Sequence, residues 1–196
     1  NARMRDMLNT KSISGPFAPR ATYSEVYPLD AFYEERGEHL PVIGRIDPPD
    51  MPQPYRSLLV HKNDMTPTLR DFYKDTIHIR VLGRHVFENE YFREVVLLLN
   101  GTEKPIEFGA IKIVLDLFPD AARREILEEK RPLGHILQEH KIPHFSRPHS
   151  FLTVASDDFI NSALKLQGTH SLYGRRNTLV DPWDRPLAEI VEILPP

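Results

Sequence analysis

Two charged residues stand in segments whose other side chains are mostly apolar. Arg93 lies within residues 91–99 and Glu192 lies within residues 188–194. If both segments are strands, side-chain alternation places each charge on the same face as the apolar residues two positions away. A buried charge is costly unless it is paired or binds a ligand. Arg93 and Glu192 therefore form an ion pair with each other, lie on a solvated face, or serve a ligand; the pattern leaves these alternatives open.

The elements that would position these charges alternate between strands and helices. Residues 55–73 are typical of a mainly helical segment with Asp64 as an N-cap, and Asn100-Gly101 between two apolar runs predicts a hairpin. We expect about six strands, mostly joined as hairpins, with helices inserted in two places, which is an α+β fold with a mainly antiparallel sheet. The expected strands are residues 76–81, 91–99, 106–117, 145–155, 171–179 and 186–194, and the expected later helices are residues 120–130, 132–138 and 157–166.

The N-terminal part has a different composition. Residues 1–25 mix small, polar and charged residues without a period, and residues 41–54 contain five prolines. Since proline cannot donate to a strand ladder or continue a helix, we expect irregular chain here and regular structure only after Pro54. The sequence is accordingly divided into a Pro-rich N-terminal extension, residues 1–54, and a domain, residues 55–196.

The composition limits the class of partner. The formal net charge is −3 and no long basic segment is present, so binding to nucleic acid or to an anionic membrane gets no support. The chain has no cysteine, which excludes disulfides, thiolate metal sites and a cysteine nucleophile. The longest apolar run, residues 95–99, is too short to cross a bilayer, and a cytoplasmic protein is the simplest interpretation. An anionic small molecule must then be held by a few placed arginine or lysine side chains.

The histidines offer no clear metal site. His135, His140, His144 and His149 lie close together in sequence, but Pro143 breaks any helix that would place His140 and His144 on one face. No carboxylates converge with them in sequence, so we expect scattered surface or strand histidines and no metal.

Six short motifs, in order and at similar spacing, resemble the chorismate lyase (chorismate pyruvate-lyase) family. They cover roughly residues 55–196, about the last two-thirds of the chain. The same superfamily includes ligand-sensing domains of bacterial transcription regulators, which share the fold without the lyase chemistry. The motifs are Asp64-Met65-Thr66, Tyr91-Phe92-Arg93-Glu94-Val95, Lys104-Pro105 followed by Gly109, Pro132-Leu133-Gly134, Leu172-Tyr173-Gly174-Arg175-Arg176 and residues 187–196.

The resemblance implies one antiparallel sheet with a ligand pocket closed by helical flaps. By position, Arg93 would bind a ring carboxylate, Glu192 would face the ring hydroxyl, and Met65 and Leu133 would wall the pocket. Arg93 and Glu192 are then the catalytic candidates for elimination of pyruvate from chorismate to give 4-hydroxybenzoate. Aromatisation drives that reaction, so no cofactor is implied, and the protein binds, orients and excludes water. Glu192 would act as a general acid or as a hydrogen-bond partner of the hydroxyl.

One position departs from the family pattern. Where the family has a Gly-Arg pair, this sequence has Gly109-Ala110, so a second cation for substrate carboxylate is missing. Arg175 or Arg176 are the substitutes within the substrate-binding set, and a salt bridge at the sheet edge is their alternative role. The departure puts chorismate in doubt as the substrate. The alternative function is a non-catalytic module that binds an aromatic acid; a DNA-binding regulator would need a helix-turn-helix that the first 55 residues do not provide.

Overall fold

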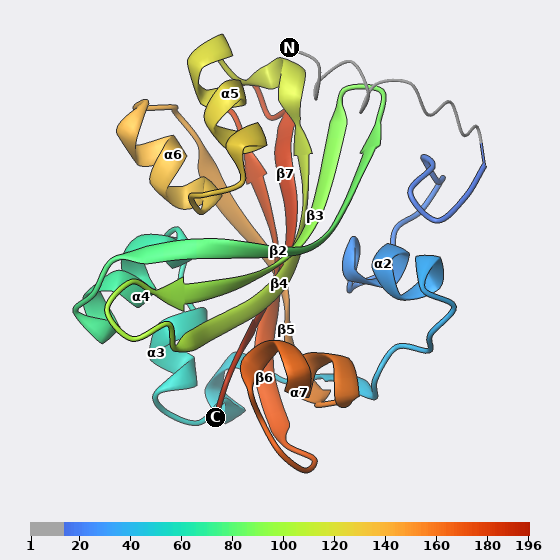
Figure 1. Ribbon diagram of the computed structural model, residues 1–196, viewed down its shortest axis with the longest axis vertical. Helices are drawn as coiled ribbons and strands as arrows, with labels where there is room; N and C mark the ends of the chain where they lie inside the picture. Colours follow the sequence, from blue (N-terminus) through green and yellow to red (C-terminus); the bar gives the residue numbers. More distant parts are fainter. Residues whose placement is uncertain (1–13) are drawn as a thin grey trace.

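A seven-stranded antiparallel sheet runs through the molecule and carries helices on both faces (Figure 1). The computed structural model describes residues 14–196. The α+β fold agrees with the expectation from sequence, with seven strands where about six were expected. In the order in which they lie side by side, the strands are β1 (Ile43–Arg45), β5 (Phe145–Ala155), β6 (Ser171–Val180), β7 (Pro186–Leu194), β4 (Pro105–Val114), β3 (Glu90–Leu99) and β2 (Ile77–Phe87).

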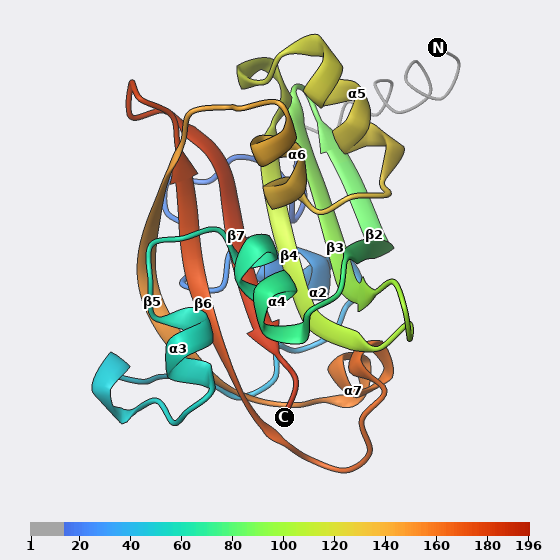
Figure 2. The same cartoon turned by 90° about the vertical axis from the view of Figure 1, so that its left-hand side faces the viewer.

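Helices cover both faces of the sheet, which explains the nearly continuous apolar runs of its central strands. β3 and β4 are buried along almost their whole length, so neither can show the alternation of a half-exposed strand. Figures 1 and 2 show helices over each of the two faces. The first face carries α3 (Tyr55–Leu59), α4 (Met65–Tyr73), α5 (Asp120–Glu128) and α6 (Leu133–Glu139), and the second carries α2 (Leu29–Glu35) and α7 (Asp158–Leu164).

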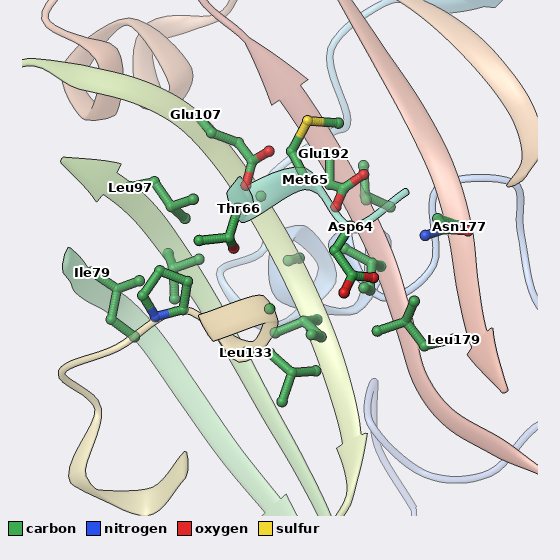
Figure 3. Close-up of a pocket in the computed structure, with 18 of the residues that line it drawn as sticks. Asp64, Met65, Thr66, Ile79, Leu97, Glu107, Leu133, Asn177, Leu179 and Glu192 are labelled. Atoms are coloured by element: carbon green, nitrogen blue, oxygen red, sulfur yellow. The ribbon is translucent and has the colours of Figure 1, made fainter. Parts of the chain in front are cut away.

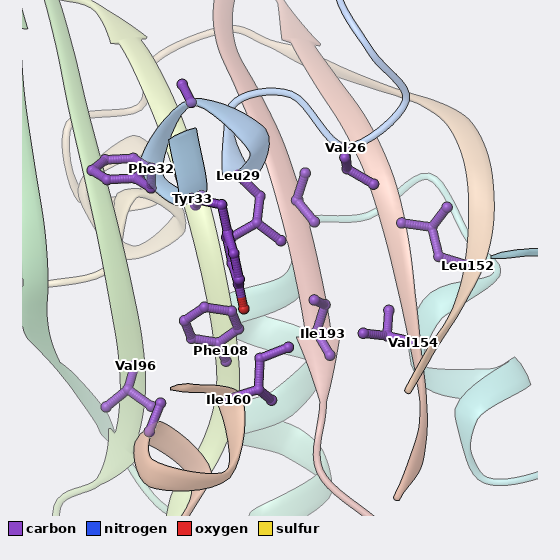
Figure 4. Packing of buried hydrophobic residues seen from close by; sticks show 14 of the residues in the cluster. Val26, Leu29, Phe32, Tyr33, Val96, Phe108, Leu152, Val154, Ile160 and Ile193 are labelled. Atoms are coloured by element: carbon purple, nitrogen blue, oxygen red, sulfur yellow. The ribbon is translucent and has the colours of Figure 1, made fainter. Parts of the chain in front are cut away.

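The expectation that regular structure begins only after Pro54 is wrong. Leu29, Phe32 and Tyr33 follow helical spacing, and α2 buries all three against the sheet together with residues of α7 (Figure 4). β1 pairs with β5 as the edge strand, which is compatible with the prolines because Pro41 and Pro48 lie outside it. Phe17 is buried in the same cluster, so part of the segment expected to be loose contributes to the core; residues 1–13 lie outside the described range.

The later elements follow the expected boundaries closely, with one division. The strands expected at residues 145–155 and 186–194 have those bounds in the structure. The helix expected at residues 55–73 is two helices, since Val60 leaves the helical conformation and Asp64 is extended as the N-cap of α4. Within residues 14–196, no helix has the length and apolar character needed to cross a membrane.

An ion pair fixes α2 to the second face. The Arg36 guanidinium lies 2.7 Å from the carboxylate of Glu94, whose side chain is fully buried, and it stacks 3.7 Å above the Phe159 ring. Tyr33 donates a hydrogen bond of 2.7 Å to Asp157, the N-cap of α7. Burial raises the pKa of Glu94 to about 7, although Arg36 acts in the opposite direction.

Glu94 should make the stability of the fold depend on pH. Its pKa in the folded state, about 7, exceeds its ordinary value of 4.5, so its contribution is complete below pH 4.5 and is lost as pH rises through 7. We expect the difference in unfolding free energy between wild type and Glu94→Gln to change by on the order of 2–3 kcal/mol across this range. Urea unfolding from about pH 4.5 to about pH 7.5 measures it; parallel curves for the two proteins would contradict the expectation.

Candidate functional site

A small cavity lies between the first face of the sheet and the N-terminal ends of α4 and α6 (Figure 3). Its volume is about 60 Å³, room for a few water molecules. The sheet supplies its floor and the two helices supply its roof. The lining residues are Asp64, Met65, Thr66, Ile79, Arg93, Val95, Leu97, Glu107, Gly109, Ala110, Ile111, Pro132, Leu133, Gly134, Arg175, Asn177, Leu179, Ile190, Val191 and Glu192.

The roof is tight because one position has no side chain. A Cβ atom at Gly134, on α6, would lie 2.7 Å from the hydroxyl oxygen of Thr66, on α4. Glycine therefore lets the two helices approach each other over the cavity. At the start of α4, Asp64 accepts a hydrogen bond of 2.7 Å from Nε2 of His144, which ties α4 to the loop before β5. This contact raises the pKa of His144 and favours its charged form.

Arg93 is buried in the cavity wall without a counter-ion. Its side chain is 2 % exposed, and it donates only long hydrogen bonds, 3.3 Å to the carbonyl of Ile126 and 3.4 Å to that of Arg131. Within the described residues its Nε has no hydrogen-bond partner. Glu129 acts on Arg93 electrostatically, but that carboxylate is held by Arg84. Burial lowers the pKa of Arg93, although the Tyr91 hydroxyl and the Glu129 carboxylate act in the opposite direction.

Arg175, by contrast, is a buried arginine whose Nε and both terminal nitrogens donate hydrogen bonds. Its Nε donates to Glu192 at 2.5 Å, across the β6–β7 ladder. Its two terminal nitrogens donate to the carbonyls of Leu59 at 3.3 Å, His61 at 3.0 Å and Asn63 at 3.1 Å, which lie at the end of α3 and in the segment before α4. The alternative in which Arg93 and Glu192 pair with each other is therefore wrong, because Arg175 occupies Glu192.

Glu107 is a further carboxyl in the same cavity, and it has no ion pair among the residues that the structure describes. It is 5 % exposed, and its Oε1 has no hydrogen-bond partner there. Burial, together with the nearby charge of Glu192, raises the pKa of Glu107 well above its ordinary value; Arg175 acts against this shift. Both effects favour the protonated carboxylic acid, which can donate a hydrogen bond.

The structure brings together five of the six residues selected from the sequence. Arg93, Glu192, Met65, Leu133 and Arg175 all line the cavity. The sixth, Arg176, does not, because it follows Arg175 on β6 and points to the other face, where it pairs with Glu189 at 2.6 Å.

Lys112 does not replace the arginine that the family has at the position of Ala110. Ala110 packs in the hydrophobic cluster of the second face. Lys112 pairs with Glu90 at 3.4 Å and lies 5.4 Å from the centres of the Tyr23 and Tyr27 rings, away from the cavity. The cavity therefore lacks that second cation.

Sequence reasoning missed Glu107, although the pattern that selected Arg93 applies to it. Glu107 is an acid within the apolar run of residues 106–117 and shares a face with Gly109 and Ile111. Asp64 was recognised only as a helix N-cap, and its place at the cavity depends on the packing of α4, which periodicity cannot supply.

The histidines near α6 each contact a different side chain. His140 lies 3.2 Å from Glu125, His135 lies 3.3 Å from Glu139, and His149 bonds the Thr178 hydroxyl at 2.5 Å. In the part of the chain that the structure describes, no group of three or more histidine, aspartate or glutamate side chains is arranged to hold a metal ion.

The two buried arginines should respond differently to the same substitution. Arg175→Met leaves Glu192 unpaired and three carbonyls without a donor, so we expect it to lower the unfolding free energy by about 3–5 kcal/mol. Arg93→Met removes a charge that has no counter-ion, so we expect a loss below about 1 kcal/mol, or a gain. Urea unfolding of both variants without added ligand measures the contrast, and equal losses would show that Arg93 is also paired.

Comparisons with known proteins identify the fold. No protein-family model and no curated protein matches this sequence. Among solved structures, the effector domain of PhnF from Mycobacterium smegmatis aligns at 11% identity and a TM-score of 0.50, covering 67% of this chain and 88% of that domain. The possible transcriptional regulator YydK from Bacillus subtilis subsp. subtilis str. 168 aligns at 12% identity and a TM-score of 0.50, covering 65% of this chain.

The matched region is only part of the longer neighbours. It spans 59% of the YydK chain and 65% of a second PhnF structure, which aligns at 10% identity with a TM-score of 0.50 over 69% of this chain. At such low identity the likeness concerns the fold alone. That fold is shared with the effector domain of PhnF and with part of the YydK chain.

Proposed function

We propose that this protein binds a small organic acid, whose carboxylate pairs with Arg93 inside this cavity. The observation that carries the proposal is the buried Arg93 guanidinium, which has two long hydrogen bonds to carbonyls and an unpaired Nε in the described residues. An isolated buried charge costs several kcal/mol unless a counter-charge accompanies it. A carboxylate fits because it accepts two parallel N–H bonds from a guanidinium.

The rest of the cavity suits the body of such an acid. Met65, Val95, Leu97 and Leu133 supply apolar walls around the charged wall residues. An apolar pocket with a few convergent polar groups is the usual form of a small-molecule site. The fold shared with regulator effector domains supports the same function by analogy only.

Ligands with a ring require the roof to open. A cavity of about 150 Å³ accommodates benzene, whereas this one has about 60 Å³. The strand floor is fixed by hydrogen bonds to its neighbours, so the space has to come from a shift of α4 and α6. The contact of Gly134 with Thr66 and the His144–Asp64 bond are the contacts that such a shift would loosen.

Elimination of pyruvate from chorismate is a second candidate function. The observation that favours it is the presence of two carboxyl groups, Glu107 and Glu192, in the same cavity as Arg93. When protonated, Glu107 can supply a proton to the departing enolpyruvyl oxygen as the C3–O bond breaks, the Glu192 carboxylate can accept the proton lost from C4, and Arg93 holds the ring carboxylate. Formation of the aromatic ring drives the elimination, and no cofactor enters this scheme. The absence of an arginine at Ala110 leaves the enolpyruvyl carboxylate without a partner.

Loss of the Arg93 charge should abolish binding. We expect 4-hydroxybenzoate to bind wild type, and Arg93→Met to weaken that affinity at least about 100-fold, because a charge-assisted contact in a buried site is removed. Titration calorimetry measures both. Arg80→Met is the matched control, since Arg80 is an exposed residue of β2 paired with Val96, whose side chain packs on the second face. Equal affinities of wild type and Arg93→Met would disprove the proposal.

A turnover assay separates the two functions. Incubation with chorismate, followed by chromatography of pyruvate and hydroxybenzoate isomers, should give no product above the spontaneous background if the protein only binds acids. Stoichiometric pyruvate and 4-hydroxybenzoate would instead establish the lyase. In that case Glu107→Gln should lower kcat about 100-fold or more with little change in KM, because the proton donor is lost.

A further inference from the structure

Most of the charges in the cavity wall are paired. Arg175 and Glu192 neutralise each other at 2.5 Å, and Asp64 is paired with His144 at 2.7 Å. Glu107 carries no charge when protonated. Among the described residues that line the cavity, this leaves one uncompensated positive charge, that of Arg93. A ligand with a single negative charge restores neutrality, and a second negative charge would find no cation.

Glu107 and Arg93 lie far apart on the cavity floor. In the β3–β4 register Glu107 lies opposite Leu97, whereas Arg93 lies opposite Ile111. Four residues at about 3.3 Å each separate the two positions by about 13 Å along the strands. Arg93 and Glu107 thus stand at opposite ends of the cavity floor. Figure 3 shows Glu107 and Glu192 together at one end, with Leu133 toward the other.

The carboxyl group of Glu107 can form a hydrogen bond with a ligand. The Arg175 N–H groups that could bind it are already taken by Glu192 and by carbonyls at the end of α3 and in the segment before α4. Oε1 of Glu107 has no partner in residues 14–196. Burial and the charge of Glu192 raise the pKa of Glu107 and so favour its protonated form, whose hydroxyl is a hydrogen-bond donor. An unsatisfied buried donor is costly, and a ligand oxygen satisfies it.

We propose that Glu107 is a specificity-determining residue, which as a neutral acid donates a hydrogen bond to an uncharged oxygen at the end of the ligand remote from Arg93. The ligand class is therefore a monoanion with its carboxylate at Arg93 and a carbonyl, ether or hydroxyl oxygen at Glu107. Dianions are rejected, because a second carboxylate would lie beside Glu192. This inference rests on the proposed function and adds the chemistry of the far end of the ligand.

Three benzoates of nearly equal shape test the inference on the whole chain by calorimetry. They carry at the para position an acetyl group, an isopropenyl group or a second carboxylate (terephthalate). We expect 4-acetylbenzoate to bind at least about 10-fold more tightly than 4-isopropenylbenzoate, corresponding to one buried hydrogen bond, and terephthalate to bind at least about 100-fold more weakly. Equal affinity for the acetyl and isopropenyl compounds, or tight binding of terephthalate, would overturn the inference.

Two variants of Glu107 assign the effect to this side chain. Glu107→Leu should abolish the preference for acetyl over isopropenyl while both compounds still bind, since Arg93 is unchanged. Glu107→Gln, which keeps a donor, should retain the preference. Thermal unfolding without ligand checks that both variants fold. A preference that survives Glu107→Leu would place the donor elsewhere and overturn the inference.

A pH series separates the neutral form from the charged one. Affinity of wild type for 4-acetylbenzoate should fall as pH rises through the raised pKa of Glu107, and that of Glu107→Gln should not follow it. Glu192 on β7, Arg175 on β6, Asp64 on the roof and His144 beyond it are present in both proteins, so their titration cancels in the comparison. If no benzoate binds wild type at all, the proposed function fails; if all bind alike, only the inference fails.

Discussion

The bonds of Arg175 hold the candidate site together. One fully buried guanidinium connects β6 to β7 through Glu192 and connects both strands to the end of α3 and the segment before α4 through three carbonyl oxygens. Those carbonyls are free to accept because the chain leaves the helical conformation at Val60. The same interaction therefore holds the segment that leads into α4 against the sheet and gives the buried Glu192 an ion-pair partner.

Three buried arginines illustrate how similar residues take different roles. Arg175 and Arg176 are neighbours on β6, and alternation sends one to the cavity and the other to Glu189 on the opposite face. Arg93 shares the cavity face with Arg175 but lacks its partners. The sheet thus carries structural ion pairs on both faces, whereas Arg93 forms no ion pair within the described residues. Residue type alone cannot reveal this difference.

Much of the fold was predictable because local patterns and tertiary packing agree. The Asn100-Gly101 turn and the apolar runs placed the central strands, and misplaced charge singled out Arg93 and Glu192, which both line the cavity, without deciding their role. Because of the prolines, α2 and β1 were not expected from the sequence. The rule that proline interrupts regular structure says nothing of short elements that lie between prolines. The pairing of Glu192 with Arg175 depends on strand order, which periodicity does not contain.

The small volume of the cavity beneath α4 and α6 has a kinetic consequence. If α4 and α6 must separate before an acid can enter, the observed association rate cannot exceed the rate of opening, whatever the ligand concentration. The apparent affinity is reduced by the fraction of time that the roof is open. Departure is subject to the same step, so a ligand that fits Arg93 poorly can still remain bound for long. Residence time and affinity are therefore set by different parts of this molecule, the roof helices and the sheet floor.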